Sequence, residues 1–226
     1  MERHFQEEIN DVRKMIIEMG TLAEEAFGLS IKSFQNLDLE LAQQVIEKDH
    51  AINALEISID KSVFKLIALN QPVAGDLRFL FSAGKINKDL ERIGDHAVNI
   101  AQATLAYASQ NYNVSASQLS TMMTVAHQML HDAITGLIDS NSQLALKVLE
   151  QDDQVDILNH LLCREVIAGV RKDITGIEAA LEMIKVIKNL ERIADLSTNI
   201  AEDVIFNARA LDIKHHAEDR ILKNKK

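Results

Sequence analysis

The sequence of 226 residues carries a formal net charge of −10. This balance argues against a nucleic-acid binder, because such binding depends on cationic side chains that neutralise phosphates. Apolar residues make up 47% of the chain and there is one proline, so an aliphatic core can form between long, rarely interrupted elements.

Apolar residues recur at steps of three and four along most of the chain, which is the period of an α-helix. The pattern predicts six helices followed by a charged tail: 3–35, 38–69, 72–108, 115–138, 141–171 and 175–211. Asp38 is expected to be the N-cap of the second helix. Capping boxes are expected where Ser115 precedes Gln118 and where Thr175 precedes Glu178.

The two halves of the chain repeat one another. The stretch DLERIGDHAVNIAQ begins at Asp89 and NLERIADLSTNIAE begins at Asn189, an offset of 100. LAQQVIEKDHAINALE from Leu41 likewise matches LALKVLEQDDQVDILN from Leu144, an offset of 103. A unit of this length is too long for a solenoid repeat. We therefore predict an all-α fold of two pseudo-symmetric three-helix bundles, in residues 1–110 and 111–226.

Both copies carry the same oxygen-rich triplet on the helix face opposite the apolar stripe: Glu91, Asp95 and Asn99, and then Glu191, Asp195 and Asn199. A solvated helix face is one interpretation. However, like charges four residues apart destabilise a helix, and oxygen ligands are those that hard divalent cations or iron prefer. The two interpretations stay open at this point.

The antiparallel partner helices supply further acids. A turn near residue 173 would place Asp152 level with Asp195, and Asp156 level with Glu191. Four carboxylates at one height repel unless a cation lies between them. In the first repeat Asp49 is the matching acid, but Asn53 replaces the second one. We therefore expect the second repeat to bind metal more tightly.

A cationic stripe accompanies the acids, and it too is repeated at an offset of 100: Lys85, Lys88, Arg92, Lys185, Lys188 and Arg192. These side chains either pair with the neighbouring carboxylates or form a surface that binds partners or anions.

Other candidate groups are weaker. His127 and His131 lie four residues apart on one helix and could chelate a metal, but no nearby third ligand can be identified, and a structural or surface role is the alternative. The lone Cys163 excludes an internal disulfide, fits a reducing compartment and is expected to be a buried, inert thiol. Nucleophile elbows, catalytic triads and phosphate-binding loops are absent from the sequence, so we do not expect an enzyme.

The stretches QPVAGDLRFLFSAGKINKDLERIGDHAVNIA and LEMIKVIKNLERIADLSTNIAE resemble the PhoU family of bacterial phosphate-signalling regulators. The resemblance implies two PhoU repeats whose acidic motifs hold multinuclear clusters of iron or another metal, with zinc, manganese and magnesium as candidates. On this sequence the motifs are Glu91 with Asp95, Glu191 with Asp195, and Asp152 with Asp156. Asp49 also matches but lacks its second acid.

The resemblance also implies a function. Members repress phosphate uptake and phosphate-starvation signalling by linking the ATPase subunit of the phosphate ABC transporter to a sensor histidine kinase, often as homodimers. The sequence contains no run near the ~18 apolar residues of a membrane span. We therefore expect a cytoplasmic protein that reaches the inner membrane through its partners. The alternatives are a metal-storage bundle and a structural module of another transporter.

Overall fold

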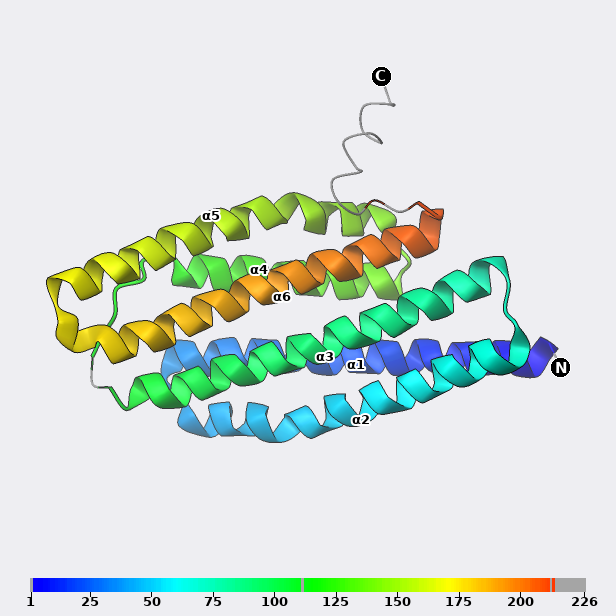
Figure 1. Ribbon diagram of the computed structural model, residues 1–226, viewed down its shortest axis with the longest axis horizontal. Coiled ribbons are helices and arrows are strands. Elements are labelled where there is room, and N and C mark those ends of the chain that lie inside the picture. The colour runs from blue at the N-terminus through cyan, green and yellow to red at the C-terminus, as the bar shows by residue number, and fades with distance from the viewer. Residues whose placement is uncertain (1, 111, 212, 214–226) are drawn as a thin grey trace, which may run out of the picture.

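The computed structural model describes residues 2–110, 112–211 and 213. These residues form six long α-helices and one short 3-10 helix, η1, with no β-strand in the described part (Figure 1). The elements are α1 (Glu2–Asn36), α2 (Leu39–Asn70), α3 (Ala74–Ala108), α4 (Leu119–Ile138), α5 (Ser142–Lys172), η1 (Ile174–Gly176) and α6 (Ile177–Arg209). The tail predicted after the last helix falls mostly outside the described residues.

Local capping explains some helix starts. Asp38 is the N-cap of α2, as predicted, and its side chain accepts a hydrogen bond of 2.9 Å from the backbone of Leu41. Both predicted capping boxes are wrong. The Ser115 hydroxyl donates instead to Glu165 on α5, at 2.6 Å, and α4 begins only at Leu119. Thr175 lies within η1, where its backbone N–H donates to the Asp173 side chain.

The six helices form two three-helix bundles, α1 to α3 and α4 to α6, which lie side by side (Figure 1). The central helices α3 and α6 run antiparallel against each other, and α1 packs on α4 behind them. Two contacts set the register along the central pair: His96 Nδ1 lies 2.8 Å from Asn189 Oδ1, and Lys85 Nζ lies 3.2 Å from Asp203 Oδ1. The predicted pseudo-symmetric fold is confirmed.

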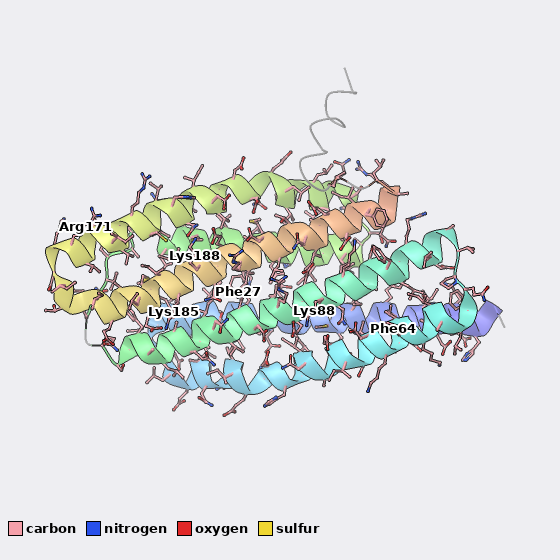
Figure 2. The ribbon with its side chains drawn as sticks, viewed as in Figure 1. Phe27, Phe64, Lys88, Arg171, Lys185 and Lys188 are labelled. Carbon is pink, nitrogen blue, oxygen red and sulfur yellow. The ribbon has the colours of Figure 1, made fainter. Side chains whose placement is uncertain are left out.

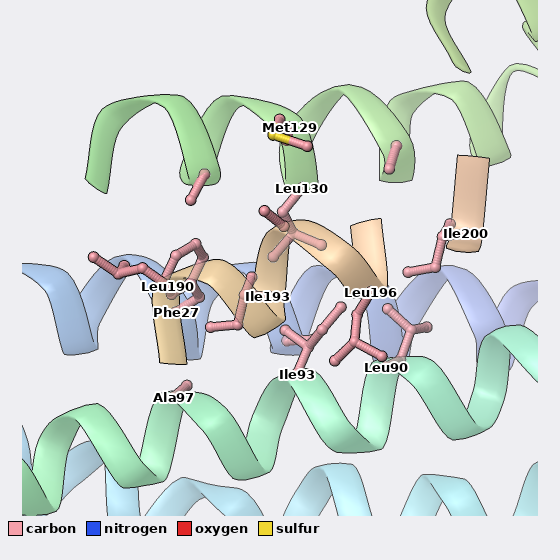
Figure 3. Close-up of a cluster of buried hydrophobic side chains, with 14 of the residues drawn as sticks. Phe27, Leu90, Ile93, Ala97, Met129, Leu130, Leu190, Ile193, Leu196 and Ile200 are labelled. Atoms are coloured by element: carbon pink, nitrogen blue, oxygen red, sulfur yellow. The ribbon is translucent and has the colours of Figure 1, made fainter. Parts of the chain in front are cut away.

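The apolar faces of the two bundles merge into one continuous buried cluster. Leu90 and Ile93 of α3 and Leu190 and Ile193 of α6 belong to this cluster (Figure 3), and all four are fully buried. Phe27 of α1 is fully buried in the same cluster. Because one core holds both central helices, their polar faces with the repeated acidic motifs are turned outward.

Candidate metal-binding sites on the central helices

Acidic site 2 consists of Asp152 and Asp156 on α5 and of Glu191 and Asp195 on α6. The structure brings these four carboxylates together. Burial, together with the nearby negative charges of Asp195 and Asp156, raises the pKa of Asp152 to about 6. Burial and the charge of Glu191 likewise raise the pKa of Asp195. The site therefore concentrates negative charge in a partly desolvated place.

Neighbouring side chains hold Glu191 in position. Its Oε2 accepts a hydrogen bond from Lys188 Nζ at 3.0 Å, and its Oε1 accepts one from Asn159 Nδ2 at 2.7 Å. Asn159 is almost fully buried. Its Oδ1 is also 3.5 Å from the sulfur of Cys163, a half-buried thiol whose pKa is raised by burial. The cysteine is thus less buried than the sequence suggested.

Acidic site 1 consists of Asp49 on α2 and of Glu91 and Asp95 on α3. Burial, followed by the charges of Glu91 and Asp49, raises the pKa of Asp95. Glu91 Oε2 lies 3.0 Å from Lys88 Nζ, and Glu56 Oε1 lies 3.8 Å from the same nitrogen. Glu56 therefore adds a carboxylate beside this site, where the second repeat has Asn159 at the matching position.

Asp49 provides the structural test of whether a cation fits acidic site 1. Its Oδ2 accepts a hydrogen bond from Asn53 Nδ2 at 2.7 Å. Its Oδ1 is buried and has no hydrogen-bond partner among the described residues. A buried carboxylate oxygen without a partner is costly, and a hard cation is a ligand that would satisfy it. The oxygen-only donor set fits a divalent cation or iron.

The structure also limits what the sites offer as they stand. Among the described residues, no three His, Cys, Asp or Glu side chains are arranged so that they could hold a metal ion. Three of the carboxylates instead form ion pairs with neighbouring cationic side chains, namely those of Glu91, Glu191 and Asp195. Asn99 and Asn199 lie exposed on α3 and α6, one helical turn beyond Asp95 and Asp195.

Gly94 is a contributing residue that the sequence analysis missed. A Cβ at this position would come within 3.3 Å of Asp49 Oδ1 and 3.0 Å of Ile52 Cδ1. The missing side chain thus lets α2 place Asp49 directly against α3. At the matching positions, the second repeat has Ala194 in place of Gly94 and the shorter Val155 in place of Ile52. The methyl group gained at Ala194 is thus offset by the one lost at Val155. The signal was the glycine inside a helix, where it costs about 1 kcal/mol relative to alanine.

Most of the cationic stripe is paired with acids. Ion pairs join Lys88 to Glu91, Lys188 to Glu191 and Arg192 to Asp195, at 3.0, 3.0 and 3.5 Å. Two more connect Lys185 to Glu182 and Lys85 to Asp203, at 2.7 and 3.2 Å. Figure 2 shows Lys88 on α3 and Lys185 and Lys188 on α6, along the two central helices. This geometry favours the ion-pairing interpretation of the stripe.

Fold and site together define a class of protein: tandem three-helix bundles in which each repeat carries an acidic motif on its last helix. The PhoU domain model matches residues 16–104 and 119–204, once in each bundle. The chain belongs to the PhoU family, as its resemblance indicated. None of the described helices contains an apolar segment long enough to cross a membrane.

Similar proteins span almost the whole chain. A phosphate-specific transport system accessory protein PhoU homolog of Aquifex aeolicus is 35% identical over 208 residues, which are 92% of this chain and 94% of that protein. The crystal structure of PhoU from Pseudomonas aeruginosa matches with a TM-score of 0.89 at 32% identity, covering 92% of this chain and 100% of that one. PhoU from Streptococcus pneumoniae matches with a TM-score of 0.83 at 30% identity, covering 93% and 99%.

Proposed function

We propose that this protein is a non-enzymatic negative regulator of phosphate uptake and of phosphate-starvation signalling. In this role it is an adaptor between the ATPase subunit of the phosphate ABC transporter and the sensor histidine kinase. The supporting observation is that both repeats match the PhoU domain, and that relatives named as phosphate-specific transport system accessory proteins match over nearly the full length of both chains. Its place of work is the cytoplasm, beside the inner membrane.

Exposed apolar side chains at the two ends of the molecule support an adaptor role. At the α2–α3 end, Phe64, Leu69 and Val73 are 78%, 71% and 75% exposed; Figure 2 labels Phe64 on α2. At the α5–α6 end, Ile174 and Leu181 are more than half exposed. Exposed apolar patches of this kind mark interaction sites. We assign these ends to contacts with the partners and with a second copy in a homodimer.

The cationic stripe is the polar part of this proposed contact surface. Lys88 and Lys185 are 57% and 62% exposed even while paired, so they remain accessible to a partner. Charged groups of this kind contribute orientation and association rate more than affinity.

The two acidic sites would bind divalent or iron ions under this proposal. Asp152, Asp156, Glu191 and Asp195 would hold the cation of the second repeat, and Asp49, Glu91 and Asp95 that of the first. A bound cation would supply positive charge between carboxylates that otherwise repel one another. The protein's own contribution is to position acids from two helices at one height, so that binding would join α2 to α3 and α5 to α6.

A deletion strain tests the regulatory role. Deleting the gene should raise expression of a phosphate-starvation reporter in phosphate-rich medium, and the wild-type gene supplied in trans should restore repression. Pull-down of the ATPase subunit and the kinase by the purified protein should succeed for both. Unchanged reporter output, together with loss of cellular iron or manganese, would instead favour the metal-storage alternative.

A further inference from the structure

The contact between α1 and α4 follows the internal repeat but does not preserve its chemistry. The offset of 103 that relates α2 to α5 also relates α1 to α4, since the two PhoU domain matches begin at 16 and 119. It carries Glu24 onto His127 and Gly28 onto His131. The contact of Glu24 with His131 is therefore the pseudo-symmetric counterpart of the contact of His127 with Gly28. The first of these two contacts contains a carboxylate, and the second does not.

The half around His127 forms a groove of about 330 Å³. Its floor is made by Gly28 and two apolar side chains, and its polar lining consists of Lys32, Gln35, Thr124, His127 and Gln128. No carboxylate is among these lining residues, whereas Glu24 and Glu25 line the adjoining hollow, which shares Gly28, Lys32 and His127 with the groove. At the positions that match Lys32, Gln35, His127 and Gln128, the other half has Thr135, Ile138, Glu24 and Glu25.

Gly28 allows the imidazole of His127 to turn toward α1. A Cβ at Gly28 would lie 3.2 Å from His127 Nε2, so this nitrogen faces the bottom of the groove. Lys32 follows one helical turn further along α1. Burial lowers the pKa of His127, while the negative charge of Glu24 raises it and the charges of His131 and Lys32 lower it. Lys32 and His127 both line the groove.

The carboxylates nearest the groove already have partners. Glu24 Oε1 lies 2.7 Å from Nδ1 of His131, on α4. Glu25 Oε1 lies 2.7 Å from Nζ of Lys48, on α2. Lys32, in contrast, forms no ion pair with any described residue. The groove thus presents the ammonium of Lys32 and an imidazole nitrogen, while the two neighbouring carboxylates contact other side chains.

Two other donors of the lining are in use. The Thr124 hydroxyl donates to the backbone of Ser120 at 2.9 Å, and the Gln128 amide donates to Asp132 at 2.7 Å. The donors that remain for a ligand are therefore Lys32, His127 and Gln35. A cation is disfavoured by the ammonium of Lys32, whereas an oxyanion matches all three groups.

We propose that the α1–α4 groove binds a tetrahedral oxyanion of the phosphate class, held by Lys32, the His127 imidazole and the Gln35 amide. The inference goes beyond the proposed function and does not rest on it. The anion comes either as inorganic phosphate or as a phosphomonoester. Binding favours the protonated imidazole, so the anion and a proton bind cooperatively. The groups that set this titration are Glu24 and Lys32 on α1, His131 on α4, and the Glu25–Lys48 pair beside them.

An NMR titration of the histidine side chains in the purified, full-length protein tests the proposal. Inorganic phosphate should raise the titration midpoint of His127 saturably, compared with sodium chloride at the same ionic strength. Glycerol phosphate, run in parallel, identifies the source: a response to phosphate alone indicates the free ion, and a stronger response to the ester indicates a phosphorylated metabolite.

Matched variants separate a site from general charge effects. Lys32→Gln should weaken binding about fivefold, the size expected for a partly exposed ion pair. Lys14→Gln removes the same charge from an exposed position elsewhere on α1 and should leave binding unchanged. His127→Gln should abolish the coupling between phosphate and proton binding. An unmoved His127 midpoint with both anions, or equal weakening by the two lysine variants, would overturn the proposal whatever the outcome of the genetic experiments.

Discussion

The substitution Asp152→Asn should stabilise the metal-free protein at pH 7.5. Burial and the charges of Asp195 and Asp156 raise the pKa of Asp152 from 3.8 to about 6 in the folded state. The folded protein therefore binds this proton more tightly than the unfolded chain does. Above pH 6, ionised Asp152 lowers the free energy of unfolding by the full amount that corresponds to the difference between its folded and unfolded pKa values. The penalty is relieved as the pH falls through 6 and is nearly gone at the unfolded value near 4.

The structure sets the size of the effect. At 1.36 kcal/mol per pKa unit, the raised pKa would correspond to about 3 kcal/mol in a fully buried group. Asp152 is only half-buried, so solvent screening reduces the expected gain to about 1–1.5 kcal/mol, or about 2–6 °C in the unfolding midpoint. Linkage predicts that the gain falls to about half at pH 5 and to about a fifth at pH 4.

Urea denaturation in a chelator-containing buffer at pH 7.5, 5 and 4 measures this gain. Asparagine and aspartate have similar helix propensities, so the difference reports the charge. Asp153→Asn is the matched control, because it removes an exposed charge from the next position on α5 and should change stability much less. The reasoning fails if Asp152→Asn leaves stability unchanged at pH 7.5, or if its gain persists undiminished at pH 4. Added metal should reverse the order and favour the parent protein.

Two further predictions concern the repeats. Glu191→Gln with Asp195→Asn should remove most bound metal, as measured by elemental analysis of protein purified without a chelator. The matching changes at Glu91 and Asp95 should remove less, because acidic site 1 has Asn53 where acidic site 2 has Asp156. Gly94→Ala should lower the free energy of unfolding by about 1–3 kcal/mol, since the new Cβ would lie 3.0 Å from Ile52 Cδ1; adding Ile52→Val should restore most of it in a double-mutant cycle.

Both predictions have direct controls. Equal metal loss from the two double variants would contradict the asymmetry between the sites. The expected difference in metal binding is reduced by Glu56, which adds a carboxylate beside Lys88 at acidic site 1. For the packing prediction, Gly84→Ala places a Cβ on the same helix at an ordinary contact distance of 4.0 Å from Val63. That variant should be neutral or stabilising through helix propensity. Equal destabilisation by both alanine variants would show that the close approach to Ile52 is not the cause.

The sequence by itself determined the features that depend on local periodicity. Apolar side chains three and four residues apart must share one face of a helix, so the six helices, the duplication and the Glu191–Asp195 spacing could be predicted within a few residues. The hairpin of α5 and α6 is nearly as local, because a short connection forces the two helices to run antiparallel. That is why Asp152 could be placed near Asp195 before the structure was known.

Only the tertiary structure decided the contacts between distant parts of the chain. The start of α4 depends on Glu165, which lies 50 residues after Ser115 and takes its hydroxyl. The close approach of Asp49 to α3 depends on Gly94. The groove at the α1–α4 contact depends on Gly28, which lies against His127 although the two are 99 residues apart in the sequence. No repeating pattern records which surfaces of two bundles will meet. That choice is made by the packing of the whole core, where a single missing methyl group determines how closely two helices approach.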